Sequence, residues 1–141
     1  MANVLLIEPD AVLGRTYRLA LEHIGHTVKV ARSAQQALNA ADDLRPKIVV
    51  LELQLASHNG IEFLHEFRSY TEWQNVPVVI NTNITPGMLE ASAVVLRRDM
   101  GVREILYKPR TSLQRLISTV NEVLRIQGGA SAETGSPGEQ L

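Results

Sequence analysis

The sequence predicts an α/β fold, a doubly wound five-stranded parallel sheet with a layer of helices on each face. Apolar runs of strand length recur at residues 3–7, 27–30, 48–53, 77–81 and 104–107. The runs are continuous rather than alternating, which is typical of strands that are buried on both faces of a parallel sheet. Helical patterns separate the runs. Strands that alternate with helices predict right-handed crossovers and therefore a three-layer sandwich.

Each helical segment between the strands carries its own signal. Four of them show apolar residues at helical spacing: Leu13, Tyr17, Ala20, Leu21 and Ile24; Ala34, Ala37, Leu38 and Ala41; Ile61, Leu64 and Phe67; and Leu113, Leu116, Ile117, Val120, Val123 and Leu124. The remaining helix, about 86–99, is predicted by its start, where Thr85 is a good cap and Pro86 takes the first helical position. Its run Val94-Val95-Leu96 is less one-sided, which indicates either extra burial or an adhesive surface.

Length and composition indicate one soluble domain. The chain has 141 residues, of which 45% are hydrophobic and 21% charged, with a formal net charge of -1. This balance does not favour a nucleic-acid partner, and the absence of cysteine excludes disulfides and thiolate metal sites. No apolar stretch approaches the roughly 20 residues that span a bilayer, and no leader pattern is visible, so we expect no membrane insertion and a cytoplasmic location. We expect a folded domain over 1–127 and a disordered tail over 128–141, which is rich in glycine, serine and glutamate.

Four polar residues each follow a predicted strand. Glu8, Glu52, Thr82 and Lys108 stand at the carboxyl ends of the first, third, fourth and fifth apolar runs. Parallel strands end at the same edge of a sheet, and this is the edge where open α/β sheets bind ligands. Two acids, a hydroxyl and an amine at that edge indicate phosphoryl chemistry with a metal ion.

The motifs around these residues occur in a characteristic order: Leu5-Leu6-Ile7-Glu8-Pro9-Asp10; Val50-Leu51-Glu52-Leu53-Gln54-Leu55, with Gly60 eight residues after Glu52; Pro77, with Thr82 five residues later; and Lys108-Pro109. With these motifs, residues 1–127 resemble the receiver domain of two-component response regulators. The resemblance implies the (βα)5, flavodoxin-like or CheY-like sandwich. It also implies that an aspartate at position 52 would accept a phosphoryl group. Mg²⁺ would be held by that residue, by a second acid in the first turn and by the carbonyl of Gln54, while Thr82 and Lys108 would contact the phosphoryl oxygens.

Three substitutions depart from that pattern. Glu52 is one methylene longer than the expected aspartate, and a misplacement of about 1 Å can cost a hundredfold in rate. Pro9 replaces the second acid and offers no side-chain oxygen, so Glu8 remains alone at the first acidic position. Asn83 stands where alanine or glycine is usual and is expected to narrow the mouth of the site. We therefore predict a degenerate receiver without catalytic residues or a cofactor, in which only weak binding of Mg²⁺ through Glu8 and Glu52 stays open.

Two further departures concern signalling. Ile105 takes the place of an aromatic residue that turns inward in the family when the threonine contacts phosphate, and a β-branched side chain cannot reproduce that movement. Ala56 replaces the proline that is common in the loop after the acceptor. The resemblance therefore implies that the usual route from phosphate to the surface is interrupted.

Several local readings stay open. We expect an ion pair between Glu52 and Lys108, which either imitates a phosphorylated aspartate and fixes an active-like state or only satisfies buried charges. Asp10 is expected to cap the first helix rather than to bind metal. Trp73 either packs locally or contacts a partner. Four histidines do not form a ligand set and are expected at the solvated surface: His23, His26, His58 and His65.

The function predicted from this reading is that of a stand-alone, non-enzymatic receiver-like protein in phosphorelay signalling. It would act through protein contacts at the face formed by about 86–127, where a basic rim is expected: Arg97, Arg98, Arg103, Arg110 and Arg115. A homodimer is compatible with this face. The first alternative is a working phosphoacceptor. The second is a flavodoxin-like cofactor protein, which the acidic loop from Glu8 to Val12 disfavours because it would repel phosphate.

Overall fold

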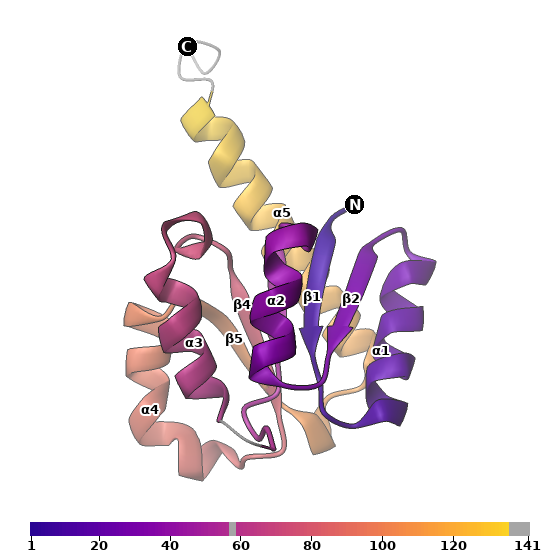
Figure 1. The fold of residues 1–141 in the computed structure, drawn as a ribbon, viewed down its shortest axis with the longest axis vertical. Coiled ribbons are helices and arrows are strands. Elements are labelled where there is room, and N and C mark those ends of the chain that lie inside the picture. Colours follow the sequence, from indigo (N-terminus) through magenta and orange to yellow (C-terminus); the bar gives the residue numbers. More distant parts are fainter. Residues whose placement is uncertain (57–58, 136–141) are drawn as a thin grey trace.

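The computed structural model describes residues 1–56 and 59–135, with only the backbone described over 129–135. Its elements are, in chain order, β1 (Asn3–Ile7), α1 (Ala11–His23), β2 (Thr27–Ala31), α2 (Ala34–Leu44), β3 (Ile48–Leu51), α3 (Gly60–Ser69), the 3-10 turn η1 (Thr71–Trp73), β4 (Val78–Thr82), α4 (Pro86–Asp99), β5 (Val102–Tyr107), the 3-10 turn η2 (Lys108–Arg110) and α5 (Leu113–Gly135). The strands form a five-stranded parallel sheet in the order β2-β1-β3-β4-β5. The predicted fold class is confirmed (Figure 1).

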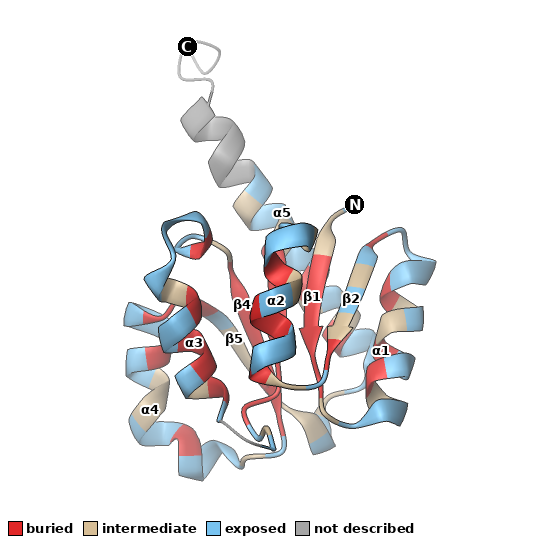
Figure 2. Cartoon of the chain, viewed as in Figure 1, coloured by how far each residue is buried: buried red, intermediate tan, exposed pale blue. Residues whose placement is uncertain are grey.

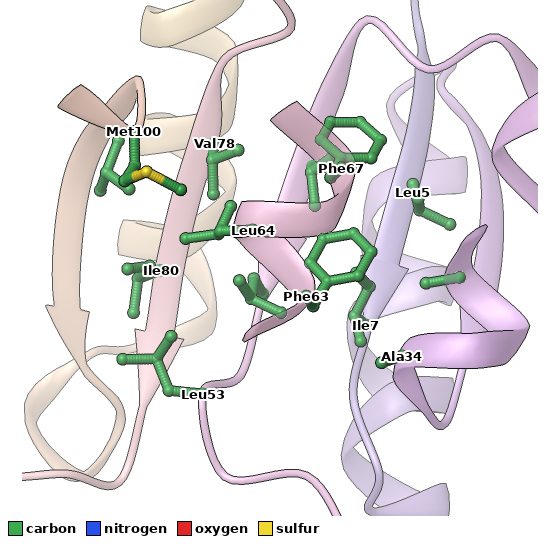
Figure 3. Close-up of a cluster of buried hydrophobic side chains, with 14 of the residues drawn as sticks. Leu5, Ile7, Ala34, Leu53, Phe63, Leu64, Phe67, Val78, Ile80 and Met100 are labelled. Carbon is green, nitrogen blue, oxygen red and sulfur yellow. The ribbon is translucent and has the colours of Figure 1, made fainter. Parts of the chain in front are cut away.

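Two apolar cores hold the layers together, one on each face of the sheet. On one face, Leu5 and Ile7 of β1 belong to a cluster that includes side chains of α2, α3 and α4, and Figure 3 shows them on the same side of the sheet as Ala34, Phe63 and Phe67. On the other face, Val4 and Leu6 point toward α1 and α5. All four side chains are at most 1% exposed, which explains why the run of β1 is continuous rather than alternating. Burial of each such side chain contributes about 1.5–3 kcal/mol, and Figure 2 shows that the buried residues are concentrated on the strands and on the sides of the helices that face them.

The start of β5 differs from the prediction. The strand begins at Val102, two residues before the predicted start at 104, and its pairing with β4 shifts in register between Val78 and Val79. β5 lies at the edge of the sheet, and Arg103 is exposed between the buried Val102 and the partly buried Glu104. Alternation of this kind is expected for an edge strand, and the charged residues concealed the first part of it from a search for continuous apolar runs.

The end of the folded chain also differs from the prediction. The backbone of α5 continues as a helix to Gly135, whereas the composition of residues 128–141 predicts a disordered tail. The sequence has no proline between Pro109 and Pro137, and the two glycines at 128 and 129 cost only about 1 kcal/mol each in a helix. In Figure 1, α5 projects beyond the edge of the sheet at which β1 begins. The rest of the predicted tail, 136–141, lies outside the described residues.

His26 is buried, so the prediction that it lies at the solvated surface is wrong. Only 8% of the residue is exposed. Its Nδ1 accepts a hydrogen bond from the backbone N–H of Ala2 at 3.1 Å, and its Nε2 lies 2.8 Å from the Oδ1 of Asn121 on α5. The ring therefore joins the start of β1 to α5. His23 and His65 are exposed as predicted, and His58 lies outside the described residues.

Trp73 packs locally, which was one of the two alternatives for it. The indole is 6% exposed and stacks on Phe67 with ring centroids 4.9 Å apart. Tyr70 contacts it from the side at 4.8 Å. Aromatic pairs of this kind add about 0.5–1.5 kcal/mol beyond the burial of their area. These ring contacts hold η1 against the end of α3.

Candidate functional site

The strand register brings the four predicted polar residues together. β1 and β3 end in matched register at Ile7 and Leu51, and β4 continues two residues beyond Ile80, the partner of Leu51, staying paired with β5 up to Thr82 and Tyr107. Glu8 and Glu52 directly follow their strands, and Lys108 directly follows β5. Glu8, Glu52 and Thr82 are at most 3% exposed, so the group is enclosed rather than presented to solvent. The predicted convergence is confirmed.

Both carboxylate oxygens of Glu52 are occupied by hydrogen-bond donors. Oε1 accepts from Lys108 Nζ at 2.8 Å and from the backbone N–H of Asn83 at 3.2 Å. Oε2 accepts from the backbone N–H of Gln54 at 3.1 Å and from the hydroxyl of Thr82. The predicted pairing of Glu52 with Lys108 is confirmed. The two backbone amides were not predicted, because any residue type at positions 54 and 83 would supply them.

Glu8 is engaged in the same way. Its Oε1 accepts from Lys108 Nζ at 2.7 Å, and its Oε2 accepts from the backbone N–H of Asp10 at 3.0 Å. The ammonium group of Lys108 thus bridges two buried carboxylates, with only 8% of its side chain exposed. Buried ions of this kind persist only when they are paired and hydrogen-bonded, and here each carboxylate oxygen has a donor.

The pKa of Lys108 gives the first testable prediction. Burial alone would lower this pKa, but the hydrogen bonds and charges of Glu52 and Glu8 outweigh burial and raise it above the ordinary value of 10.5. A lysine whose pKa is higher in the folded than in the unfolded state stabilises the fold fully below the unfolded pKa. This contribution disappears as the pH rises through the folded pKa. We expect the free energy of unfolding, measured with urea, to fall from about pH 10.5 upward in the wild type. A matched Lys108→Met variant should lack this component, and identical pH profiles of the two proteins would refute the assignment.

Asp10 caps α1, as predicted. Its backbone is extended, and its Oδ1 accepts from the backbone N–H of Leu13 at 2.9 Å. We expect Asp10→Ala to lower the free energy of unfolding by about 1 kcal/mol, the usual cost of a lost cap. Asp10→Ser should restore most of this loss, because serine also caps helices. Thermal unfolding followed by circular dichroism measures the stability of both variants. A serine variant that is no more stable than the alanine variant would contradict the capping role.

The residues at this edge do not fit a divalent metal ion. Mg²⁺ requires near-octahedral oxygen ligands, yet all the oxygens of Glu8 and Glu52 already accept hydrogen bonds. Pro9 supplies no side-chain oxygen, and its carbonyl accepts from the guanidinium of Arg32 at 3.2 and 3.1 Å. Within the described ranges 1–56 and 59–135, no three histidine or acidic side chains gather into a metal-binding group.

Arg32 is the residue of this edge that the sequence analysis missed. It directly follows β2, as Glu8 follows β1, so its place next to a strand end was a usable signal. It did not stand out because arginine is usually solvated, and Arg32 is indeed exposed. Its positive charge beside Pro9 is a further feature that disfavours a metal cation here.

The remaining predicted positions lie around the mouth of the site. The side chains of Asn83, Gln54 and Ala56 are exposed. Ile105, which stands where the resemblance implies an inward-turning aromatic residue, is partly buried and packs against the core on the α4 side of the sheet. A cavity of about 200 Å³ lies beside it between α4 and β5, with Ile84 and Leu89 among its lining residues.

Comparison with known proteins identifies the class to which this fold and site belong. The family described as the response regulator receiver domain matches residues 4–121, and the chain belongs to this family. The KDP operon transcriptional regulatory protein KdpE of Escherichia coli is 33% identical over 109 residues, which cover 77% of this chain and 45% of that protein. The swarming motility regulation protein RssB of Serratia marcescens is 31% identical, with coverage of 96% and 59%. The DNA-binding response regulator MtrA of Mycobacterium tuberculosis is 30% identical, with coverage of 93% and 54%.

The chain spans about half the length of these curated relatives. Among solved structures, the CheY-like receiver domain protein from Methanospirillum hungatei has a TM-score of 0.80 at 19% identity, covering 92% of this chain and 98% of that one. CheY4 of Vibrio cholerae has a TM-score of 0.77 at 21% identity, with coverage of 87% and 98%. These likenesses establish the shared fold. Within the described part of the chain, no helix combines the length and apolar character needed to cross a membrane.

Proposed function

We propose that this receiver domain signals through protein contacts without being phosphorylated, and that the carboxylate of Glu52 stands where a phosphoryl group would. One observation carries the proposal. Four donors from three segments of the chain converge on this carboxylate: an ammonium group, a hydroxyl and two backbone amides. They include the threonine and the lysine that, by resemblance to the family, would contact phosphoryl oxygens. On this proposal the domain is not an enzyme, and the carboxylate of Glu52 supplies permanently the negative charge that a phosphoryl group would bring.

The hydrogen bonds to Glu52 also make its carboxylate a poor nucleophile, which supports the same proposal. Attack on a phosphorus atom needs a carboxylate oxygen with a free lone pair and a cation that neutralises the incoming charge. Each oxygen of Glu52 accepts two hydrogen bonds, and the ammonium of Lys108 is shared with Glu8. A phosphoryl donor would add negative charge beside two buried carboxylates. The donors would also have to leave Glu52 before it could react.

The face formed by α4, β5 and the first half of α5 is the proposed contact surface for a signalling partner or a second copy of this chain. α4 as a whole exposes apolar side chains, with Met88 77%, Val94 60% and Val95 44% exposed, while the α4 residues that line the cavity next to β5 are Pro86, Leu89, Ala93 and Arg97. The predicted adhesive character of this helix is consistent with these values. Of the five arginines of the predicted basic rim, Arg97 pairs with Glu104 and Arg98 with Asp99. The proposed face thus carries mixed charge, and a partner that also covers the exposed side of α4 would bury apolar side chains of that helix.

Incubation with a small phosphoryl donor and Mg²⁺, followed by intact mass measurement, tests the proposal. We expect no phosphorylated species in the wild type. The double variant Pro9→Asp with Glu52→Asp replaces both departing residues with the usual acids and serves as the matched control, in which labelling should appear. Wild-type labelling that disappears in Glu52→Ala would contradict the proposal and favour a working phosphoacceptor.

A further inference from the structure

Two arginines line a small cavity at the opposite edge of the sheet from Glu52. The cavity measures about 200 Å³ and lies where β4 and β5 begin. Arg68 from the end of α3 and Arg103 from β5 line it, together with the polar side chains of Gln74, Asn75 and Gln127. No carboxylate is among the lining residues. The cavity is thus positively charged and polar, and it is separate from the site described above.

Arg68 is fixed in place before any ligand arrives. Its Nε donates to the carbonyl of Met100 at 2.9 Å, and its Nη1 donates to the carbonyl of Trp73 at 2.6 Å. Gly101, which has a positive φ of 69°, makes room for it, because a Cβ there would lie 2.5 Å from Nη2. A rigid guanidinium loses little conformational entropy when it binds an anion, so this arrangement is favourable for recognition.

No carboxylate faces the two arginines within this cavity, although Arg103 also lines a neighbouring cavity with Glu104 and Glu122. Arg103 Nη2 donates to Gln127 Oε1 at 2.9 Å, which is a neutral partner. Among the described residues, neither Arg68 nor Arg103 forms an ion pair with a carboxylate. Burial lowers the pKa of Arg68, and the nearby charge of Arg103 lowers it further. Two like charges held together in this way are relieved by an anion between them.

We propose that this cavity, named here the Arg68–Arg103 pocket, binds a small dianionic oxyanion, of which inorganic phosphate and a short dicarboxylate are the two simplest sources. The N–H groups of Arg68 and Arg103 that the bonds to Met100, Trp73 and Gln127 leave over can donate to the oxygens of such an anion, and the two positive charges match its double charge. The volume admits a phosphate-sized anion with a few waters, since one water takes about 30 Å³. The anion would join the loop before β4, the start of β5 and α5, the helix that projects from this edge (Figure 1).

Titration with sodium phosphate, followed by backbone NMR at constant ionic strength, tests this proposal. We expect saturable shifts of the amides at 74–76, 101–103 and 127. Arg103→Gln is the main variant, because Arg103 is exposed and its guanidinium bonds only a side chain. Loss of one charge-assisted contact should weaken phosphate binding about tenfold or more. Arg15→Gln is the matched control, since it removes the same charge from an exposed position on α1 and should bind phosphate like the wild type.

A second variant and a second ligand complete the test. Arg68→Lys keeps the charge but loses the planar fork, so it should also bind phosphate more weakly. A parallel titration with succinate distinguishes the two candidate anions. Tighter binding of phosphate assigns a phosphate site, and tighter binding of succinate assigns a dicarboxylate site. Shifts that stay linear, or that are equal in the wild type and Arg103→Gln, would overturn the proposal.

Discussion

Replacement of Lys108 with methionine is expected to lower the free energy of unfolding by about 3–5 kcal/mol, the usual cost of removing one partner from a buried ion pair. The ammonium of Lys108 lies 2.7 Å from Glu8 and 2.8 Å from Glu52, and it is the cation that holds both carboxylates in the interior. Methionine fills a similar volume but leaves two buried negative charges facing each other. Urea denaturation at pH 7 measures the effect.

Lys29→Met is the matched control, because Lys29 is an exposed lysine on β2. It should change the free energy of unfolding by no more than about 0.5 kcal/mol. The triple variant Glu8→Gln, Glu52→Gln, Lys108→Met removes all three charges and should recover part of the loss, since no uncompensated carboxylate remains. A Lys108→Met protein within about 1 kcal/mol of the wild type would show that the three charges are effectively solvated.

Glu52→Gln should have the second largest effect, a loss of about 1.5–3 kcal/mol together with a conformational change that extends to α4 and β5. The glutamine amide can place an oxygen against only one pair of donors. Its NH₂ group must then face the backbone N–H of either Gln54 or Asn83, and two donors cannot bond each other. Rearrangement of the β4–α4 loop relieves that conflict, so we expect backbone NMR shifts from Thr82 into α4.

The same variant separates the two roles that remain open for Glu52. If its carboxylate imitates a phosphoryl group, Glu52→Gln alters the α4–β5–α5 face and lowers the affinity for a partner that binds there. If it only balances Lys108, the shifts do not extend past the start of α4 to β5 and α5, and partner affinity is unchanged. Glu22→Gln, at an exposed glutamate that pairs with Arg18 on α1, is the matched control for loss of a carboxylate.

The strand ends explain how much of this site the sequence could predict. Parallel strands end at one edge, so four polar residues after four apolar runs had to converge, and Glu8, Glu52, Thr82 and Lys108 do. The ion pair with Glu52 was also predictable from this placement. The bridging role of Lys108 between two carboxylates was not, because it depends on side-chain conformations that a sequence pattern does not encode.

The features that the sequence did not predict have a common physical origin. His26 and Asn121 are 95 positions apart, and their contact depends on how α5 packs beside the start of β1. The first residues of β5 were missed because edge strands alternate, and the continuation of α5 was missed because glycine, serine, proline and glutamate with few large apolar groups indicated disorder from 128 onward. In each case, tertiary contacts or the surrounding helix outweighed the local signal.

Backbone NMR with Mg²⁺ and then beryllofluoride, a phosphoryl mimic, tests most directly whether this receiver domain is insensitive to phosphate. We predict no saturable shifts at Glu8, Glu52, Thr82 or Lys108 in the wild type, and saturable shifts in the Pro9→Asp, Glu52→Asp variant measured beside it. Saturable wild-type shifts at those four residues that spread through 86–127 would contradict the account, because they would show a site that still binds the metal and responds to the phosphoryl group.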